Sequence, residues 1–269
     1  MNAFEIENLE CSYLEKGPAV VWIEKLGIPK GKLTVILGRS GSGKSTLLEA
    51  LGLMNNTIRE GRVTYHSPCR DENLAGIWHR YRKVAAIRKN RFSFIFQDDY
   101  LMPHYTNSEN MLIARLIQGG MNPVPAGEMI DRLTGSLNLS GNGIRNKFPY
   151  QVAGGQRQRL SFARAMMKDF DILFGDEPTG NLDYKNSGRL IGYIKETIRE
   201  KAATAIVVTH NIELSAEKAD RIVMLSPCAD KNRARFSIQP DHVFDRDGQD
   251  QWINYPEQDD LVAFIKNAI

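Results

Sequence analysis

The sequence contains no apolar run long enough to span a membrane and no signal-peptide-like hydrophobic segment at its N-terminus. It also shows no internal repeat and no low-complexity segment. These absences predict a cytosolic chain that reaches a membrane only through another subunit. The 269 residues suffice for one large domain or for a core domain with a subdomain.

Cysteine and excess charge are also scarce. The three cysteines, Cys11, Cys69 and Cys228, are odd in number and show no Cys-x-x-Cys spacing. This pattern predicts bystander thiols in a reducing compartment. A net charge of +3 is too small to indicate nucleic-acid binding by itself.

One glycine-rich stretch matches a phosphate-binding motif. Residues 38–46 agree with G-x-x-x-x-G-K-[ST] at every fixed position. Apolar residues precede it and helix-forming residues follow it, which predicts a strand, a tight turn and a helix. In such a turn the backbone N–H groups and the positive end of the helix dipole face one anion. Lys44 is expected to reach the β- and γ-phosphates, and the Ser45 hydroxyl to bind Mg²⁺. The stretch therefore predicts a nucleoside triphosphate site made of Gly38, Ser40, Gly41, Gly43, Lys44, Ser45 and Thr46.

Three later apolar strands end on polar residues, namely Gln97, the pair Asp176 and Glu177, and His210. Ligand contacts in α/β folds gather at the carboxyl ends of parallel strands. We expect Asp176 to hold Mg²⁺, directly or through water, and Glu177 to orient and partly deprotonate the attacking water. His210 is placed to reach the γ-phosphate. Solvated acids and a structural histidine are the alternative, which the glycine-rich stretch disfavours.

Two further features are ambiguous on residue type alone. Gly154 and Gly155 stand before the expected helix Leu160–Met167 and predict a second anion-binding turn. Tyr13 follows the expected strand Phe4–Leu9, where it would either stack on a purine base or close the end of a strand.

The remaining pattern predicts alternating strands and helices. Residues 68–91 are rich in Lys and Arg and predict a solvated helix face that packs through Val84, Ala85 and Ile87, with an anionic-membrane or nucleic-acid patch as the alternative. Residues 100–145 predict a small helical insertion, interrupted at Gly119-Gly120, Asn122-Pro123 and Pro125.

The expected strands are Phe4–Leu9, Val20–Leu26, Leu33–Leu37, Gly61–Tyr65, Phe92–Phe96, Ile172–Glu177, Thr204–Thr209 and Arg221–Leu225. The expected helices are Leu47–Leu51, Asn107–Gln118, Gly127–Leu137, Leu160–Met167, Asn186–Lys201 and an amphipathic segment, Leu261–Ile269, that docks on the chain's own core.

Taken together, the motifs resemble the ABC-type ATPases, the nucleotide-binding subunits of ATP-binding-cassette transporters. The resemblance covers residues 4–226 in family order. It implies an α/β fold with a P-loop NTPase core, a mixed sheet flanked by helices, and an antiparallel β subdomain near the N-terminus. It also implies a helical subdomain inserted at about residues 98–160 and a C-terminal extension over 227–269. The string from Asp176 to Asp183 is similar to the branch that serves lipoprotein release, macrolide export and cell-division permeases.

The resemblance implies a role for each motif. Tyr13 becomes the adenine-stacking aromatic, Glu177 the catalytic glutamate and His210 the switch histidine. Gln97 becomes the Q-loop residue, with a catalytic role and a place beside Ser45 and Asp176 among the Mg²⁺ ligands. The further ATP contacts come from the signature loop and the D-loop, namely Ala153, Gly154, Gly155, Gln156 and Asp183.

The signature loop departs from the family pattern L-S-G-G-Q, because Val152 and Ala153 replace its leucine and serine. In the family this loop reaches across a dimer interface to the γ-phosphate that the other copy holds. Ala153 removes one hydroxyl donor, and a hydrogen bond to a charged group is worth about 1.5–3 kcal/mol. We therefore expect weaker ATP-driven closure, with Gly154, Gly155 and the helix dipole still in place.

The implied function is a Mg²⁺-dependent ATPase that powers substrate movement through a separate membrane subunit by ATP-driven dimer closure. The helical subdomain and Gln97 would transmit this motion. The implied partners are ATP, a second copy of the chain and an integral membrane permease subunit, with no nucleic acid. The implied location is cytoplasmic, peripheral at the inner face of the cell membrane.

A soluble ABC-type switch that acts on DNA or ribosomes is the alternative function. The DNA-maintenance ATPases require a long coiled coil between Lys44 and Gly154, where this chain has a compact insertion. The ribosome-associated factors usually carry two cassettes, and this chain has one P-loop. A small kinase or GTPase has no place for the signature-like loop or Asp183, and the guanine-specifying N-K-x-D is missing.

Overall fold

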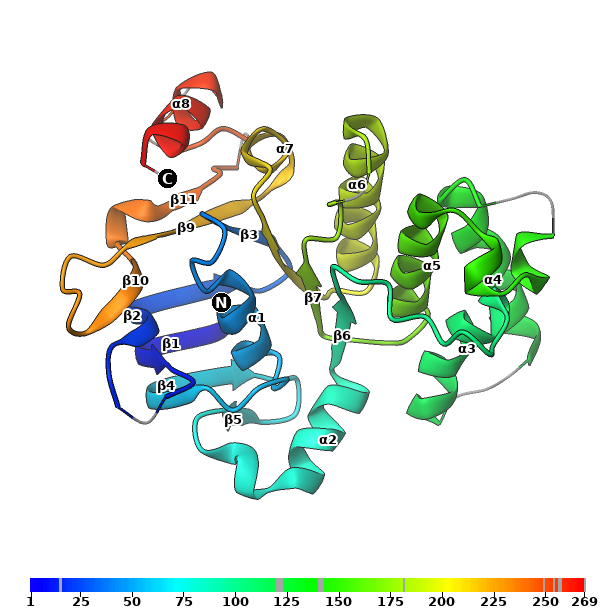
Figure 1. The fold of residues 1–269 in the computed structure, drawn as a ribbon, viewed down its shortest axis with the longest axis horizontal. Helices are drawn as coiled ribbons and strands as arrows, with labels where there is room; N and C mark the ends of the chain where they lie inside the picture. The colour runs from blue at the N-terminus through cyan, green and yellow to red at the C-terminus, as the bar shows by residue number, and fades with distance from the viewer. Residues whose placement is uncertain are drawn as a thin grey trace.

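The computed structural model describes residues 1–14, 16–119, 123–139, 143–180, 182–248, 250–253, 255 and 258–268. The sequence features at Gly120, Asn122, Asn181 and Ile269 lie outside the described residues. A curved sheet with its helices forms one end of the molecule, and the helices between residues 107 and 166 form the other end (Figure 1).

The N-terminal part is an antiparallel layer. Strands β1 (Asn2–Cys11), β2 (Ala19–Pro29), β4 (Ile58–His66) and β5 (Asp71–Asn73) pair in the order β5-β4-β1-β2. Phe4, Ile6 and Leu9 of β1 are fully buried in a hydrophobic cluster that also contains Leu47 and Leu51. This confirms the antiparallel β subdomain; β1 and β2 extend beyond the ranges expected from the apolar residues.

The central part is parallel and fixes the position of the site. Strands β9 (Arg221–Pro227), β3 (Leu33–Gly38), β8 (Thr204–Thr209), β7 (Ile172–Asp176) and β6 (Phe92–Ile95) follow one another in that order. Every residue of β3 and β8 is buried, as expected for strands covered on both faces. The carboxyl ends of these strands therefore meet along one edge of the sheet.

Residues beyond 226 contribute to the same sheet. Strand β10 (Ala234–Ile238) lies between β2 and β9, parallel to β2 and antiparallel to β9, and joins the two layers. Strand β11 (Val243–Asp245) pairs with β9. The proposed boundary at residue 226 therefore falls within β9, and the proposed extension supplies a strand that links the antiparallel and parallel parts.

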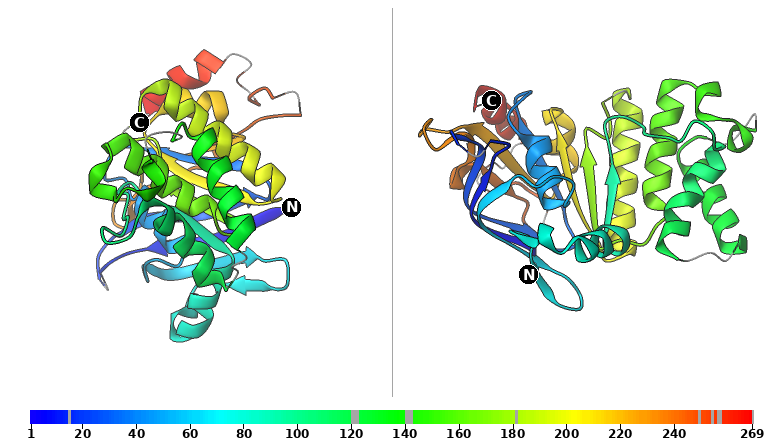
Figure 2. Two further views of the ribbon diagram at one scale, coloured as in Figure 1. Left: turned by 90° about the vertical axis from the view of Figure 1, so that its right-hand side faces the viewer. Right: turned by 60° about the horizontal axis from the view of Figure 1, so that its bottom comes forward.

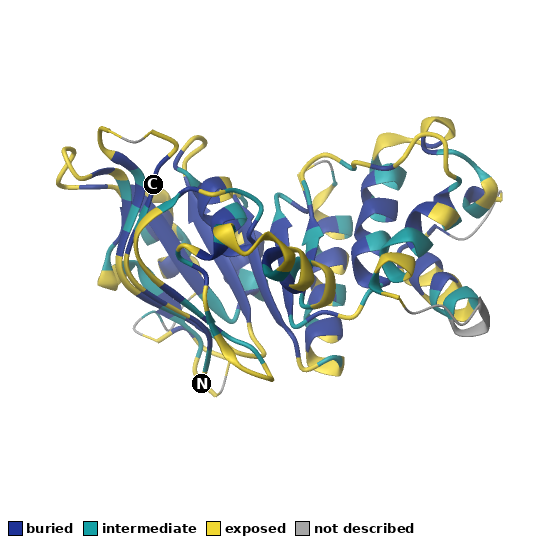
Figure 3. Cartoon of the chain, turned by 90° about the horizontal axis from the view of Figure 1, so that it is seen from below, coloured by how far each residue is buried: buried dark blue, intermediate teal, exposed yellow. Residues whose placement is uncertain are grey.

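The helices fall into two groups. Helices α3 (Asn107–Gln118), α4 (Pro123–Ser136) and α5 (Gly154–Met166) stand beside the sheet, between β6 and β7 in the chain (Figure 2). Helices α1 (Lys44–Leu51), α2 (Tyr81–Asn90), α6 (Tyr184–Glu200), α7 (Ile212–Lys218) and α8 (Gln258–Ala268) lie around the sheet, as Figure 1 shows. Short 3-10 turns cover Ile77–His79, Ile144–Asn146, Pro149–Gln151 and Pro240–His242. Buried residues follow the sheet and the inner helix faces (Figure 3).

Three local expectations were wrong. Helix α4 begins at Pro123, four residues before the expected Gly127, and Pro125 does not interrupt it, because proline is tolerated in the first turn of a helix. Helix α5 begins at Gly154 rather than Leu160. In α2 Val84 and Ile87 are buried as expected, but Ala85 is exposed, because it lies between them on the other side of the helix.

The terminal helix docks on the chain itself, as expected. Leu261 and Ile265 of α8 have no exposed surface and belong to the main core. Across the described residues, no helix has both the length and the apolar character needed to cross a membrane.

Candidate functional site

The loop between β3 and α1 has the shape that the glycine-rich motif predicts. Gly41 and Gly43 have φ angles of +75° and +89°, a region in which only glycine is unstrained. A Cβ atom on Gly43 would also lie 2.6 Å from a methyl group of Val21. None of the described side chains caps the first turn of α1, so its backbone N–H groups remain available to an anion.

Lys44 lies inside the curve of this loop. Its ammonium donates to the carbonyl oxygens of Gly38 (2.8 Å) and Arg39 (2.9 Å), and the residue is only 8% exposed. Burial lowers the pKa of Lys44, whereas the negative charges of Glu177 and Asp176 act to raise it. The loop therefore holds a buried cation next to two carboxylates.

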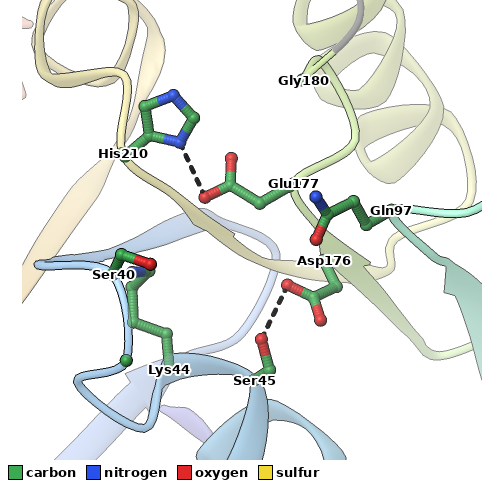
Figure 4. Close-up of a pocket in the computed structure, with 9 residues that line it drawn as sticks. Ser40, Lys44, Ser45, Gln97, Asp176, Glu177, Gly180 and His210 are labelled. Carbon is green, nitrogen blue, oxygen red and sulfur yellow. Dashed lines mark hydrogen bonds and ion pairs between the residues drawn. The ribbon is translucent and has the colours of Figure 1, made fainter.

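Nine residues line a cleft of about 440 Å³ at this edge of the sheet, and eight of them are labelled in Figure 4. They come from the loop after β3, from the first turn of α1, and from the carboxyl ends of β6, β7 and β8 with the residues that follow them. The cleft brings together Ser40, Gly41, Lys44, Ser45, Gln97, Asp176, Glu177, Gly180 and His210. All but Gly180 were singled out in the sequence. The glycine-rich motif identified four of them, and the other four are polar residues at the ends of parallel strands, which meet at this edge.

The oxygen atoms beside α1 suit Mg²⁺. The Ser45 hydroxyl donates to Asp176 Oδ1 (3.1 Å), and the Gln97 amide lines the same cleft (Figure 4). A carboxylate, a hydroxyl and an amide oxygen are hard donors of the kind that Mg²⁺ prefers. Burial raises the pKa of Asp176, the Ser45 hydrogen bond lowers it, and the charge of Glu177 raises it again. Within the described part of the chain, no group of three or more His, Cys, Asp or Glu residues offers a competing metal site.

Glu177 is held by three hydrogen bonds. Its backbone N–H donates to Val208 O (2.9 Å), its Oε1 lies 3.0 Å from His210 Nδ1, and its Oε2 accepts from Thr209 Oγ1 (3.0 Å). Its φ of +44° is unusual for a residue with a side chain, and such strain persists only where neighbours enforce it. The Glu177 side chain is 13% exposed and His210 is 74% exposed. A nearly buried carboxylate is thus in contact with a solvent-exposed histidine.

Sequence reasoning missed Thr209. It is the last residue of β8, 6% exposed, and its hydroxyl also accepts the backbone N–H of Asn211 (3.2 Å). A hydroxyl residue directly before His210 was the available signal, but its partner Glu177, the residue after β7, becomes evident only once the strands are paired.

Four of the predicted ATP-binding residues are not among the described residues that line the cleft, namely Tyr13, Gly38, Gly43 and Thr46. The Tyr13 hydroxyl lies 3.1 Å from Thr46 Oγ1, and 56% of Tyr13 is exposed. The aromatic ring is thus tethered to α1 with its surface open. Its stacking on adenine stays a prediction.

The signature loop and the D-loop residue begin two helices. Ala153 precedes the first turn of α5, which contains Gly154 and Gly155, and Gln156 Oε1 accepts the backbone N–H of Ala153 (3.0 Å). Asp183 caps α6 by accepting the backbone N–H of Asn186 (2.9 Å), and this bond lowers the pKa of Asp183. The described residues that line the cleft include none of these five motif residues, so one chain alone does not bring the signature loop to its own P-loop.

Sequence analysis also missed the polar links behind the cleft. Asp99, two residues after Gln97, pairs with Arg157 of α5 at 2.9 Å. Arg164 donates to the carbonyl oxygens of Asp99 (3.0 Å) and Tyr100 (2.6 Å). No local pattern in the sequence joins these residues, since more than fifty positions separate them.

A P-loop that faces a carboxylate pair and a histidine at parallel strand ends defines a P-loop nucleoside triphosphatase. Within that class, residues 24–180 match the family described as "ABC transporter". The chain belongs to this family.

Similar proteins share most of the chain. The lipoprotein-releasing system ATP-binding protein LolD of Zymomonas mobilis is 32% identical over 227 residues, which cover 83% of this chain and 93% of LolD. LolD 1 of Chlorobium luteolum is 35% identical over 82% of this chain and 93% of its own length. The dimeric ATP-binding cassette MJ0796, solved in a post-hydrolysis state with ADP and Pi, aligns with a TM-score of 0.72, 27% identity, and coverage of 82% and 93%.

These matches confirm the expected fold and the resemblance to the lipoprotein-release branch. The chain is an ATP-binding and ATP-hydrolysing subunit of an ABC transporter or permease complex. The matches favour this function over a soluble switch that acts on DNA or ribosomes.

Proposed function

We propose that Glu177 is the residue that accepts a proton from the water attacking the γ-phosphate of ATP. The observation that carries this proposal is the fixed carboxylate, which Thr209 and His210 hold through one oxygen each. His210 and Gln97 then complete the catalytic group from the neighbouring strand ends. Lys44 and the free N–H groups of α1 bind the phosphates.

Ser45, Asp176 and Gln97 are the residues that would hold Mg²⁺. When bound, the ion neutralises charge on the phosphate oxygens. The Ser45 and Asp176 oxygens already lie 3.1 Å apart, which supports a shared site.

The active unit in this proposal is a dimer. The signature residues Ala153, Gly154, Gly155 and Gln156 start α5 on an exposed turn, where a second copy can present its own nucleotide. Asp183 lies close by, because its neighbour Leu182 is next to Gly155. The solved cassette MJ0796, which is similar over most of the chain, is a dimer. Tyr13 would contribute the stacking surface for adenine.

The membrane partner is a separate permease subunit, and the chain is peripheral at the inner face of the cell membrane. The similarity to ATP-binding proteins of lipoprotein-releasing systems supports this assignment and the narrower branch. In this proposal the helical subdomain, about residues 98–160, and Gln97 pass the closure of the dimer to that permease.

Steady-state ATP hydrolysis by the purified full-length chain tests the catalytic part. Glu177→Gln should lower kcat by at least about 100-fold, because the amide cannot accept the proton, while ATP binding persists. Glu7→Gln makes the same chemical change on the exposed face of β1 and should leave kcat unchanged. Chelation of Mg²⁺ with EDTA should abolish turnover. Full activity in Glu177→Gln would exclude Glu177 as the base.

The partner is tested by purification of the tagged chain from its native membranes in mild detergent. An integral membrane protein at near-equal stoichiometry supports the permease assignment. Recovery only from soluble fractions, alone or with ribosomes or DNA, contradicts it.

A further inference from the structure

Helix α7 begins two residues after His210, and hydrogen bonds connect the helix to the histidine loop. Asn211 Oδ1 accepts the backbone N–H of Leu214 (3.0 Å), which caps the helix. The Asn211 N–H itself donates to Thr209 Oγ1, the hydroxyl that holds Glu177. A helix of seven residues is too short to hold its position by its own hydrogen bonds. Whatever anchors α7 therefore also anchors the loop that carries His210.

Two side chains from the C-terminal region bind the far end of α7. The Arg246 guanidinium donates to Ala216 O and to Glu217 O (2.8 Å), and Trp252 Nε1 donates to Ala216 O (3.1 Å). Carbonyl groups in the last turn of a helix have no partner within that helix, so these donors supply what α7 lacks. The Arg246 charge also complements the negative end of the helix dipole.

Several contacts hold Arg246 in this position. Its side chain is 9% exposed, its guanidinium lies 4.7 Å from the centre of the Trp252 ring, and it pairs with Asp250 at 2.8 Å. The Arg246 backbone N–H donates to Asp220 O (3.1 Å), two residues beyond the end of α7.

Helix α8 covers the outer side of α7. The two helices lie next to each other near the C-terminus (Figure 1). Leu261 and Ile265 are fully buried in the core that contains Leu214 of α7. Lys266 pairs with Glu213 at 2.6 Å, in the first turn of α7. Arg246, Trp252 and α8 thus hold both ends of the short helix, and we call them the α7 clamp.

We propose that the α7 clamp sets the orientation of His210 over Glu177, so that Arg246 and Trp252 are positioning residues for ATP hydrolysis. This inference rests on the proposed catalytic roles of Glu177 and His210. It gives the C-terminal region a function in the reaction, although Arg246 and Trp252 contact α7 rather than the cleft.

The primary test compares kcat and KM for ATP in the full-length chain. Arg246→Gln should lower kcat at least about tenfold, because small misplacements of a catalytic group are costly, with KM within about twofold of wild type. Arg246→Lys, which keeps the charge and one donor, should recover part of the loss. Trp252→Phe keeps an aromatic ring, removes the Nε1 donor together with part of the indole, and should give a smaller loss of the same kind.

Arg233→Gln is the matched control. Arg233 also lies over a tryptophan, 4.0 Å from the Trp22 ring centre, and pairs with Glu10 at 3.4 Å, but it is next to β10 rather than α7. Its kcat should equal that of wild type. An equal loss in Arg233→Gln and Arg246→Gln would show a general effect of arginine removal and overturn the proposal.

A double-mutant cycle separates positioning from mere stability. In a His210→Ala background, Arg246→Gln should change kcat by less than about twofold, because the histidine through which it acts is gone. The proposal fails if the fold-losses of kcat in His210→Ala and Arg246→Gln multiply in the double variant. It also fails if the loss of kcat in Arg246→Gln equals the loss of folded protein seen in nucleotide-binding titrations. A wild-type chain without ATPase activity would instead contradict the proposed function. An active wild-type chain together with a normal kcat in Arg246→Gln would contradict only the role proposed for the α7 clamp.

Discussion

Removal of the Thr209 hydroxyl tests the geometry of the proposed base most directly. In Thr209→Val the side chain keeps its size and branching, and the residue is 6% exposed, so packing is preserved. Two hydrogen bonds disappear: the one donated to Glu177 Oε2 (3.0 Å) and the one accepted from the Asn211 N–H (3.2 Å). The first affects the carboxylate and the second affects the histidine loop.

The expected size follows from the charged partner. A hydrogen bond to an ionised group is worth about 1.5–3 kcal/mol. If that energy orients Glu177 in the transition state, kcat falls by roughly 10- to 150-fold. We expect the lower end of this range, because His210 Nδ1 still contacts Oε1. The unpaired Asn211 N–H costs about 1–3 kcal/mol of folding free energy as well.

Steady-state ATPase assays and denaturant unfolding measure the two effects separately. Thr209→Ser keeps the hydroxyl and should retain most of the activity. Thr204→Val makes the same change at the other end of β8, where the buried hydroxyl accepts the Gly31 N–H (3.0 Å). It should lose stability with normal kcat. The reasoning is refuted if Thr209→Val loses no more kcat than Thr204→Val.

Three further predictions concern the signature loop, a half-buried lysine and a buried tyrosine. Ala153→Ser restores the hydroxyl donor of the signature loop and should raise or preserve ATPase activity; a large loss would mean that the loop is adapted to another geometry. Burial lowers the pKa of Lys168 from 10.5 to about 8. Between these pH values the unfolded chain therefore binds more protons than the folded chain. The free energy of unfolding rises with pH over this range, by up to about 3 kcal/mol. Equilibrium unfolding of Lys168→Met across that range should lack this rise, and an identical slope in both proteins would contradict it. Tyr65→Phe removes the hydroxyl that donates to Asp171 (2.8 Å) and should cost about 1–2 kcal/mol in denaturant unfolding without changing kcat.

The parts of the site that depend on local sequence were predictable. The loop around Gly41 and Gly43 is fixed by backbone freedom and by its place between a strand and a helix. Asp176 and His210 share an edge because their strands are parallel, whatever the exact register. In both cases a short stretch of adjacent residues is enough to predict where the side chains lie.

The parts that depend on distant partners were not predictable in this way. The apolar residues of β10 give no sign that this strand would insert between β2 and β9, since both partners lie far away in the chain. Thr209 looked like any other β-strand residue until β7 was paired with β8. Pro123 reads as a break because proline lacks an N–H group, but a first-turn position needs none.

Helix α5 contacts two of the segments that carry cleft residues. Arg157 at the start of α5 pairs with Asp99 just beyond Gln97, and Gln158 Nε2 donates to Pro178 O (3.0 Å), next to Glu177. We therefore expect a rotation of α5 to act on the segments after β6 and β7 that carry Gln97 and Glu177. Because the signature residues form the start of the same helix, we expect a change at Gln97 or Glu177 in one cleft to alter the surface that α5 offers to a second copy.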